Sequence, residues 1–120
     1  MFDWGKYLEL ALSLGESSDE ASARSAVSRA YYAVFCSARN WLKENEQDFF
    51  MTPSGENHKI VWDYFNQGPQ RLRKKIATDG RRLRGQRNTA DYDDEVTGLD
   101  NMKNAALMRA QNLLKLLGEL

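Results

Sequence analysis

Residue types that cross-link chains, break helices or bind metals are scarce in these 120 residues, which include one cysteine, two prolines and one histidine. The single cysteine, Cys36, excludes an internal disulfide and any multi-cysteine metal site, and it suits a reducing compartment. We predict neither a bound metal nor a cofactor. With so few prolines and no sustained strand-like alternation, the pattern is helical throughout.

An excess of one charge sign and a long apolar run are also missing. The 17 Lys and Arg residues balance the 17 Asp and Glu residues, so no global field favours nucleic acid or an anionic membrane. The amino-terminal segment, residues 1–6, is neither basic nor followed by a long apolar stretch. We therefore expect no secretory signal, no membrane span and a cytoplasmic protein.

The composition and length are those of one globular domain. Hydrophobic residues make up 42% and charged residues 28% of the chain, which is typical of a folded protein. We expect a single domain over residues 1–120. Apolar periodicity predicts helical segments at about 4–14, 18–45, 53–67, 70–92 and 99–117. The expected fold class is all-α, an antiparallel bundle of four to five helices with short loops.

Local signals suggest where these helices begin and end. Ser17 and Glu20 have the spacing of a capping box, and Thr52–Pro53 reads as a cap followed by proline at the first helical position. Gly15 is a plausible stop for the first helix. The fourth segment is predicted to bend or split at Asp79–Gly80. Thr97–Asp100 resembles another capped start.

The second predicted helix has two contrasting faces. One face is a core seam of Ala23, Val27, Ala30, Tyr31, Val34, Ala38, Trp41 and Leu42. The opposite face carries Ser25, Arg29, Tyr32, Cys36 and Arg39. Small residues at 26 and 33 flank this polar face and would let another helix come close.

Charge is unevenly distributed along the chain. A basic run contains Arg71, Arg73, Lys74, Lys75, Arg81, Arg82, Arg84 and Arg87, and an acidic segment follows with Asp91, Asp93, Asp94 and Glu95. The basic run could follow an RNA backbone. It could equally be a solvated helix face, since no interleaved aromatics offer a stacking platform. The acidic segment would repel nucleic acid or clamp the basic run of a second subunit.

Three motifs resemble a known family. Arg-x-Tyr-Tyr-Ala-x-Phe occupies Arg29 to Phe35, Asn-His-Lys-Ile-Val occupies Asn57 to Val61, and Arg-x-x-Ala-Asp-Tyr occupies Arg87 to Tyr92. In this order on an all-helical chain, the motifs are similar to those of the small stand-alone HEPN domain proteins of prokaryotes.

The resemblance implies a helical bundle that forms a homodimer, with functional residues near the dimer cleft. Many HEPN proteins are metal-independent ribonucleases that use an arginine followed within a few residues by a histidine. Others pair with a minimal nucleotidyltransferase in toxin–antitoxin or defence modules. In this sequence Ala90 stands where a histidine would follow Arg84, and the histidine, His58, is on another helix.

The candidate ligand or interface residues are Arg29, Tyr32, Arg84, Arg87, Asp91 and Tyr92. Residues 84, 87 and 91 share one helix face, and three interpretations are open. The first is a polar cleft that binds phosphate or a partner, or performs catalysis, with Tyr92 at its edge. The second is a structural Arg87–Asp91 ion pair. The third, which we favour, is a partly buried polar network that includes Arg29 and Tyr32 at or under a dimer interface.

Other polar residues have simpler interpretations. His58 is expected to cap a helix or face solvent, and Tyr31 to pack in the core. Cys36 lacks a partner in sequence that would make it a nucleophile. Tyr92 stands two places after Ala90, and a tyrosine two places after the histidine is a modification target in related toxin modules. Modification of Tyr92 is therefore a hypothesis.

The sequence thus predicts a HEPN-like binding or accessory component of a toxin–antitoxin or defence module. It would act as a homodimer, with a minimal nucleotidyltransferase as a possible partner and RNA as a possible ligand. The alternative is a divergent metal-independent ribonuclease that uses Arg84, Arg87, Asp91 and Tyr92. A structural interaction protein without a nucleotide or RNA ligand is also open.

Overall fold

Five α-helices form the fold in the computed structural model, which describes residues 1–52 and 57–120. The helices are α1 (Gly5–Gly15), α2 (Glu20–Asn45), α3 (Asn57–Phe65), α4 (Arg71–Tyr92) and α5 (Leu99–Gly118). No strand occurs within the described ranges, so the predicted all-α class is confirmed. No helix in those ranges is both long and apolar enough to traverse a lipid bilayer.

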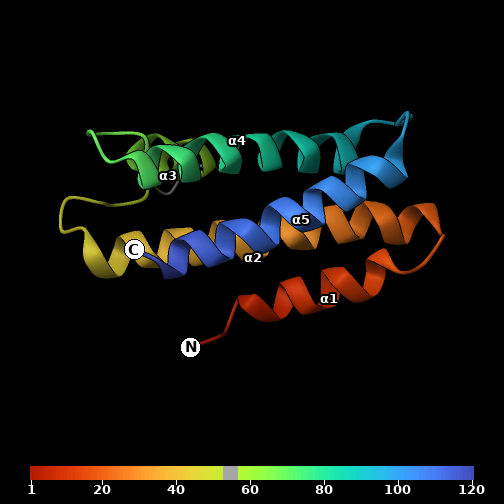
Figure 1. Ribbon diagram of the computed structural model, residues 1–120, viewed down its shortest axis with the longest axis horizontal. Coiled ribbons are helices and arrows are strands. Elements are labelled where there is room, and N and C mark those ends of the chain that lie inside the picture. Colours follow the sequence, from red (N-terminus) through yellow and green to blue (C-terminus); the bar gives the residue numbers. More distant parts are fainter. Residues whose placement is uncertain (53–56) are drawn as a thin grey trace.

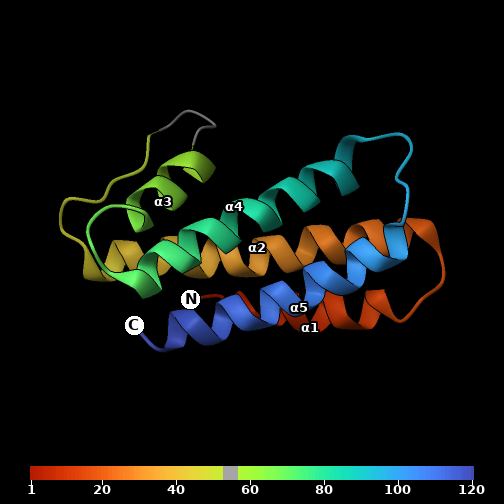
Figure 2. The same cartoon turned by 45° about the horizontal axis from the view of Figure 1, so that its top comes forward.

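Helix α2 is the centre of the bundle, and every other helix contacts it. The chain alternates direction along the longest dimension of the molecule, which measures 43 Å: α1 and α4 run one way, and α2 and α5 run the other (Figures 1 and 2). Helices α1 and α4 both contact α2 and α5, but they do not pack against each other. A groove therefore follows α2 between them.

The apolar seam predicted for α2 forms the core. Seven of its eight residues are buried, and Trp41 is partly buried. The largest core side chains from the other helices are Trp62, Phe65, Ile76, Leu83 and Leu113. The small residues Ala26 and Ala33 are also fully buried, so the close approach that they permit is used within this chain. A Cβ placed on Gly15 of α1 would lie 3.9 Å from Ala26.

Two of the predicted helix caps are wrong, although α5 begins at Leu99 as predicted. The N-cap of α2 is Asp19, whose carboxylate accepts from the Ser22 backbone N–H at 3.1 Å, and Ser17 instead accepts from the Asp19 backbone N–H at 3.2 Å. Asp19 prevails because its backbone is extended and immediately precedes the helix. Helix α5 begins after Gly98, which has a left-handed φ of 68° and no side-chain cap. The predicted start at Thr52–Pro53 extends beyond the described residues.

The predicted bend or split of the fourth helix is also wrong. Helix α4 is continuous through Asp79 and Gly80. Gly80 is needed for packing, because a Cβ there would lie 2.5 Å from ring atoms of Trp62 on α3. Gly15 likewise remains helical as the last residue of α1, and its Cβ would lie 2.8 Å from a methyl group of Leu107. Both glycines allow close helix packing.

Candidate functional site

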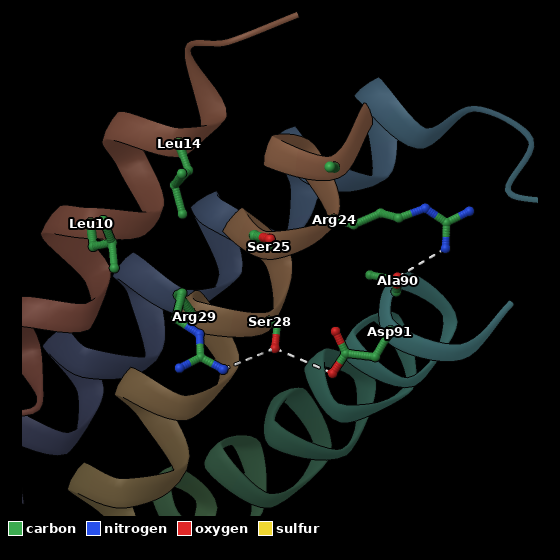
Figure 3. A pocket seen from close by; sticks show the side chains of 9 residues that line it. Leu10, Leu14, Arg24, Ser25, Ser28, Arg29, Ala90 and Asp91 are labelled. Atoms are coloured by element: carbon green, nitrogen blue, oxygen red, sulfur yellow. Dashed lines mark hydrogen bonds between the residues drawn. The ribbon is translucent and has the colours of Figure 1, made fainter. Parts of the chain in front are cut away.

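The polar face of α2 is the floor of a cleft between α1 and α4, which we call the α2 cleft. It consists of two adjoining cavities of about 710 and 420 Å³ that share Ser28, Arg29 and Asp91. In the larger cavity, Leu10 and Leu14 of α1 face Ala90 and Asp91 of α4 across α2 (Figure 3). The cleft exists because α1 and α4 flank α2 without closing over it.

The smaller cavity combines arginines with aromatic rings. The Arg29 guanidinium lies 5.0 Å from the centre of the Tyr7 ring and 5.4 Å from that of Tyr32. Arg87 covers Tyr32 at 5.1 Å, and the Arg39 guanidinium lies 5.6 Å from the Trp4 ring. These distances are within the range of cation–π attraction. The cavity thus holds three guanidiniums over aromatic faces.

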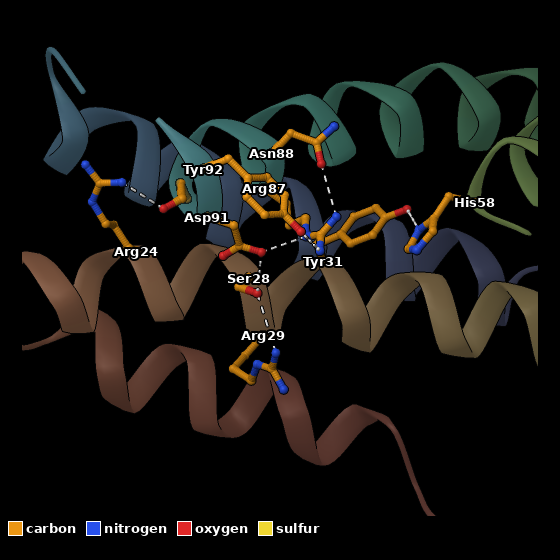
Figure 4. A network of polar contacts seen from close by, with 10 residues as sticks. Arg24, Ser28, Arg29, Tyr31, His58, Arg87, Asn88, Asp91 and Tyr92 are labelled. Atoms are coloured by element: carbon orange, nitrogen blue, oxygen red, sulfur yellow. Dashed lines mark hydrogen bonds and ion pairs between the residues drawn. The ribbon is translucent and has the colours of Figure 1, made fainter. Parts of the chain in front are cut away.

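One carboxylate, Asp91, faces these three cations. Its Oδ2 accepts from Arg87 Nε at 2.8 Å and from the Ser28 hydroxyl at 3.2 Å, and Arg29 Nη2 approaches Ser28 at 3.5 Å (Figure 4). Arg29 and Arg39 form no ion pair with a carboxylate in the described part of the chain. The cleft therefore has an excess of positive charge.

The expected Arg87–Asp91 ion pair is present, and its side chains are partly shielded from solvent, with exposures of 13% and 24%. The favoured polar network is also present within a single chain: it joins Arg87 and Asp91 to Ser28 and Arg29, with Tyr32 under the arginines. Because the pair is partly shielded from solvent, removing either of its side chains should destabilise the fold more than removing one member of a fully exposed pair would.

Of the other two candidate residues, Tyr92 borders this network through Arg87, whereas Arg84 lies apart from it. Tyr92 is 70% exposed at the end of α4, where its hydroxyl is 3.5 Å from Arg87 Nη2. Arg84 does not line the α2 cleft. Its Nε is buried without a hydrogen-bond partner among the described residues, and its positive charge acts on His58 of α3 instead.

His58 was expected to cap a helix or face solvent, but in the structure it is hydrogen-bonded to a core side chain. Its Nδ1 is 2.7 Å from the hydroxyl of Tyr31, which also accepts from Trp62 Nε1 at 3.1 Å. The imidazole stacks on Phe35 at 4.1 Å. Burial, together with the smaller effects of the Arg84 and Arg87 charges, lowers the pKa of His58 to about 4. The ring is therefore neutral near pH 7.

The sequence contained a signal that His58 contacts the core. His58, Trp62 and Phe65 follow the spacing of one helix face, and the last two are fully buried. Tyr31 packs in the core as expected, and burial strongly raises the pKa of its hydroxyl. Burial also raises the pKa of the Cys36 thiol, against the opposing effect of Arg39 and Arg29, so this thiol is not activated.

The basic run does not form one continuous surface. Arg73 pairs with Glu46 at 2.8 Å, Lys75 pairs with Asp79 at 3.0 Å, and Arg81 pairs with Asp63. Arg73 and Arg81 thus hold α4 to neighbouring segments, whereas Lys75 is paired within α4. The acidic segment is held through its backbone, because Arg24 donates to the carbonyl oxygens of Ala90, Asp93 and Asp94 at 3.0, 2.6 and 3.1 Å.

Within the described ranges, no group of three or more His, Cys, Asp or Glu side chains is arranged to hold a metal ion. The chemistry available in the α2 cleft is therefore that of guanidiniums, aromatic rings, hydroxyls and one carboxylate. Such a set binds anions and planar groups.

Comparison with known proteins adds one relative. An uncharacterized protein of Methanocaldococcus jannaschii is 31% identical over 117 aligned residues. The alignment covers 81% of this chain and 64% of the relative, so the chain spans less than two thirds of that protein's length. No family model matches the chain. No solved structure matches it either. The chain is thus similar over most of its length to a longer archaeal protein whose name states no activity.

Proposed function

We propose that this protein is a HEPN-like helical domain that acts by binding, as an accessory component of a toxin–antitoxin or defence module. Its ligand site would be the α2 cleft. The observation that carries this proposal is the excess of guanidiniums over carboxylates in a cavity lined with aromatic rings. The all-helical bundle and the convergence of Arg29, Tyr32, Arg87 and Asp91 in one cleft support the resemblance to this family.

The chemistry of the cleft suits a phosphate-bearing ligand such as RNA. Arg29 and Arg39 have guanidinium donors that no carboxylate occupies in the described part of the chain, and a guanidinium fork matches two phosphate oxygens. The Tyr7 and Tyr32 rings lie under the Arg29 guanidinium and hold it in place at the same site. Asp91 repels a phosphate less than a free carboxylate would, because Arg87 and Ser28 already satisfy it.

Fluorescence anisotropy with a labelled single-stranded RNA tests this site. We expect wild-type binding that weakens as salt rises. The double variant Arg29→Gln/Arg39→Gln should bind at least about tenfold more weakly, because two charge-assisted contacts are lost. Arg82→Gln/Lys115→Gln removes two charges outside the cleft and serves as the matched control. Equal affinity for the double variant and the wild type would refute the assignment.

A homodimer is the second part of the proposal. It is supported by exposed apolar area at the two rims of the cleft: Leu10, which lines the cleft from α1, is 45% exposed, and Tyr92, which follows the lining residue Asp91 on α4, is exposed as well. A partner surface that covers these rims would enclose the cleft and remove apolar area from water.

A minimal nucleotidyltransferase is the proposed heterologous partner, and the Tyr92 hydroxyl is its proposed modification site. The exposure of Tyr92 supports access by an enzyme. Mass spectrometry of the protein co-expressed with a nucleotidyltransferase encoded beside it would detect a nucleotide adduct on Tyr92. The Tyr92→Phe variant is the control. An unmodified Tyr92 after co-expression would remove this part of the proposal.

A metal-independent ribonuclease is a second candidate, because the imidazole that α4 lacks is supplied from α3. The positive charges of Arg84 and Arg87 lower the pKa of His58, so these arginines lie within electrostatic range of the imidazole. The test is incubation of the pure protein with structured RNA and a chelator. Cleavage that disappears in Arg87→Ala would favour the enzyme over the binding module. The absence of cleavage at any protein concentration would argue against it.

A further inference from the structure

A separate cavity of about 530 Å³ lies between α4 and α5, and we call it the α4–α5 groove. From α4 it is lined by Lys75, Asp79 and Arg82. From α5 it is lined by residues that begin at Ala105 and end at Glu119. The two helices pack against each other and run in opposite directions (Figure 1). At the rise of an α-helix, the lining part of α5 spans roughly 21 Å, which is long enough to receive a segment of another chain.

Positive charge predominates in the α4–α5 groove, where four cationic and two acidic side chains line the walls. One of the acids, Asp79, is already paired with Lys75 at 3.0 Å and with Arg82 at 3.8 Å. Arg109 and Lys115 of α5 form no ion pair with a carboxylate in the ranges that the structure describes. Two cations of the groove are therefore open to an acidic ligand.

The guanidinium of Arg109 is held in place without a ligand. Its Nη1 donates to Oε1 of Gln86 on α4 at 2.8 Å, and the Arg109 side chain is half-buried. A guanidinium has several N–H donors in a planar fork that matches a carboxylate, so the bond to Gln86 leaves others for a ligand. Because the side chain is already ordered, a carboxylate that binds it loses less conformational entropy.

An apolar patch accompanies these cations on α5. Met108 is 64% exposed, and it lines the groove together with Ala105 and Leu116. A methionine side chain adapts to apolar partners of different shapes, and covering it removes apolar area from water. No aromatic residue is among the described residues that line the groove, so it offers nucleobases no stacking platform. Aliphatic contacts between cations suit a protein segment better than RNA.

We propose that the α4–α5 groove docks an acidic segment of another protein, which places an aliphatic side chain on Met108 and carboxylates on Arg109 and Lys115. Charge complementarity selects this occupant, because the groove has more cations than carboxylates. The groove between two antiparallel helices suits an amphipathic helix. It shares no lining residue with the α2 cleft, so the proposal does not depend on the function proposed for that cleft.

NMR of the full chain with isotope-labelled methionine methyl groups tests the groove directly. The chain has four methionines, and Met108→Leu identifies the signal of Met108. The probe is a synthetic acidic helix in which leucines recur at helical spacing and glutamates fill the other positions. We expect the Met108 signal to shift and to saturate as the acidic helix is added. The signal of Met102, which does not line the groove, should change little.

Variants separate docking in the groove from a general effect of charge. Arg82→Gln/Lys115→Gln should bind the acidic helix at least about fivefold more weakly, because two exposed cations are lost. Arg29→Gln/Arg39→Gln loses as many charges in the α2 cleft and should bind it as the wild type does. The two variants have the opposite expected effects on RNA, so failure here and failure in the α2 cleft are distinguishable. Met108→Ala should weaken docking by about fivefold through lost apolar contact.

The proposal fails if the Met108 signal is unchanged by the acidic helix at about 1 mM, or if Arg82→Gln/Lys115→Gln binds it as tightly as the wild type. A basic helix with lysines in place of the glutamates is the control, and an equal shift with both helices would exclude charge recognition. A shift caused by single-stranded RNA but not by the acidic helix would assign the groove to nucleic acid instead. A shift that appears when the protein alone is concentrated would assign it to a second copy of this chain.

Discussion

On the buried face of α2, the side chain of Tyr31 joins the hydrophobic core to polar groups on α3. Tyr31 is fully buried among apolar residues, yet its hydroxyl joins the indole of Trp62 to the imidazole of His58. Satisfaction of all three polar groups makes this burial tolerable. The same contacts orient His58 and determine which of its nitrogens faces outward.

Removal of the Tyr31 hydroxyl should therefore destabilise the fold. Tyr31→Phe leaves Trp62 Nε1 and His58 Nδ1 without a partner, and we expect a loss of about 1–3 kcal/mol in the free energy of unfolding. Urea unfolding followed by tryptophan fluorescence measures the loss. The control is Tyr64→Phe on α3, whose hydroxyl makes no hydrogen bond with a described residue. A similar change in both variants would contradict the role of the network.

The depressed pKa of His58 predicts how stability depends on pH. The ordinary pKa of the imidazole is 6.5 and its pKa in the folded protein is about 4, so the unfolded chain takes up the proton first as pH falls. The contribution of His58 to stability is complete above about pH 6.5 and is lost progressively toward pH 4. Unfolding free energies measured between pH 7 and pH 4 should show this decline. In His58→Gln the slope within this window should be smaller, and an identical slope would rule the explanation out.

At the scale of elements, glycines in α4 have opposite roles although they are five residues apart. Gly80 lies against the Trp62 ring, where a Cβ would be 2.5 Å from ring carbons. Nothing lies within 4 Å of a Cβ placed on Gly85. The first glycine lets α3 pack close to α4, and the second only lowers helix propensity.

This pair gives a matched substitution test. Gly80→Ala should lower the free energy of unfolding by about 1–3 kcal/mol, because the indole must move out of a packed core. Gly85→Ala should raise it by roughly 0.5–1 kcal/mol, because alanine favours the helix and meets no obstacle. Thermal and urea denaturation of both variants measure the difference. Equal effects of the same sign would contradict the assigned packing role of Gly80.

At the scale of the whole molecule, the arrangement of four long helices decides where ligands and partners have access. Helices α1 and α4 lie on either side of α2 without touching, so the polar face of α2 remains open although the core seam on its opposite face is buried. Leu10 lines this opening, and the exposed Tyr92 follows the lining residue Asp91 on α4. An assembly that buries these rims would use the cleft as part of its interface.

We therefore predict that the wild-type protein sediments as a dimer at tens of micromolar. Leu10→Arg places a charge at the rim of the cleft and should shift the protein toward monomer, because burial of that charge opposes association. Met108→Arg alters a residue of α5 that is exposed outside the cleft, and it should remain dimeric. Sedimentation velocity compares the three proteins. A wild-type monomer would refute the homodimer.

Helical periodicity made much of α2 and α4 predictable. The core seam from Ala23 to Leu42 follows from spacing along one helix, and so does the Arg87–Asp91 pair. The packing of the polar face of α2 against the polar face of α4 was also foreseeable, because each of these helices is amphipathic. The N-cap at Asp19 was less so, because Ser17 offers a competing local signal and the backbone conformation chooses between them.

The sequence by itself determined the all-helical class, the extent of the long helices and the polar character of one face of α2, because these depend on residues three or four apart. Only the tertiary structure decided that Gly80 admits Trp62, that Arg84 diverges from the Arg87–Asp91 network, and that His58 meets Tyr31. These contacts join different helices. They depend on how each helix is rotated and how closely it approaches its neighbours, which local periodicity does not encode.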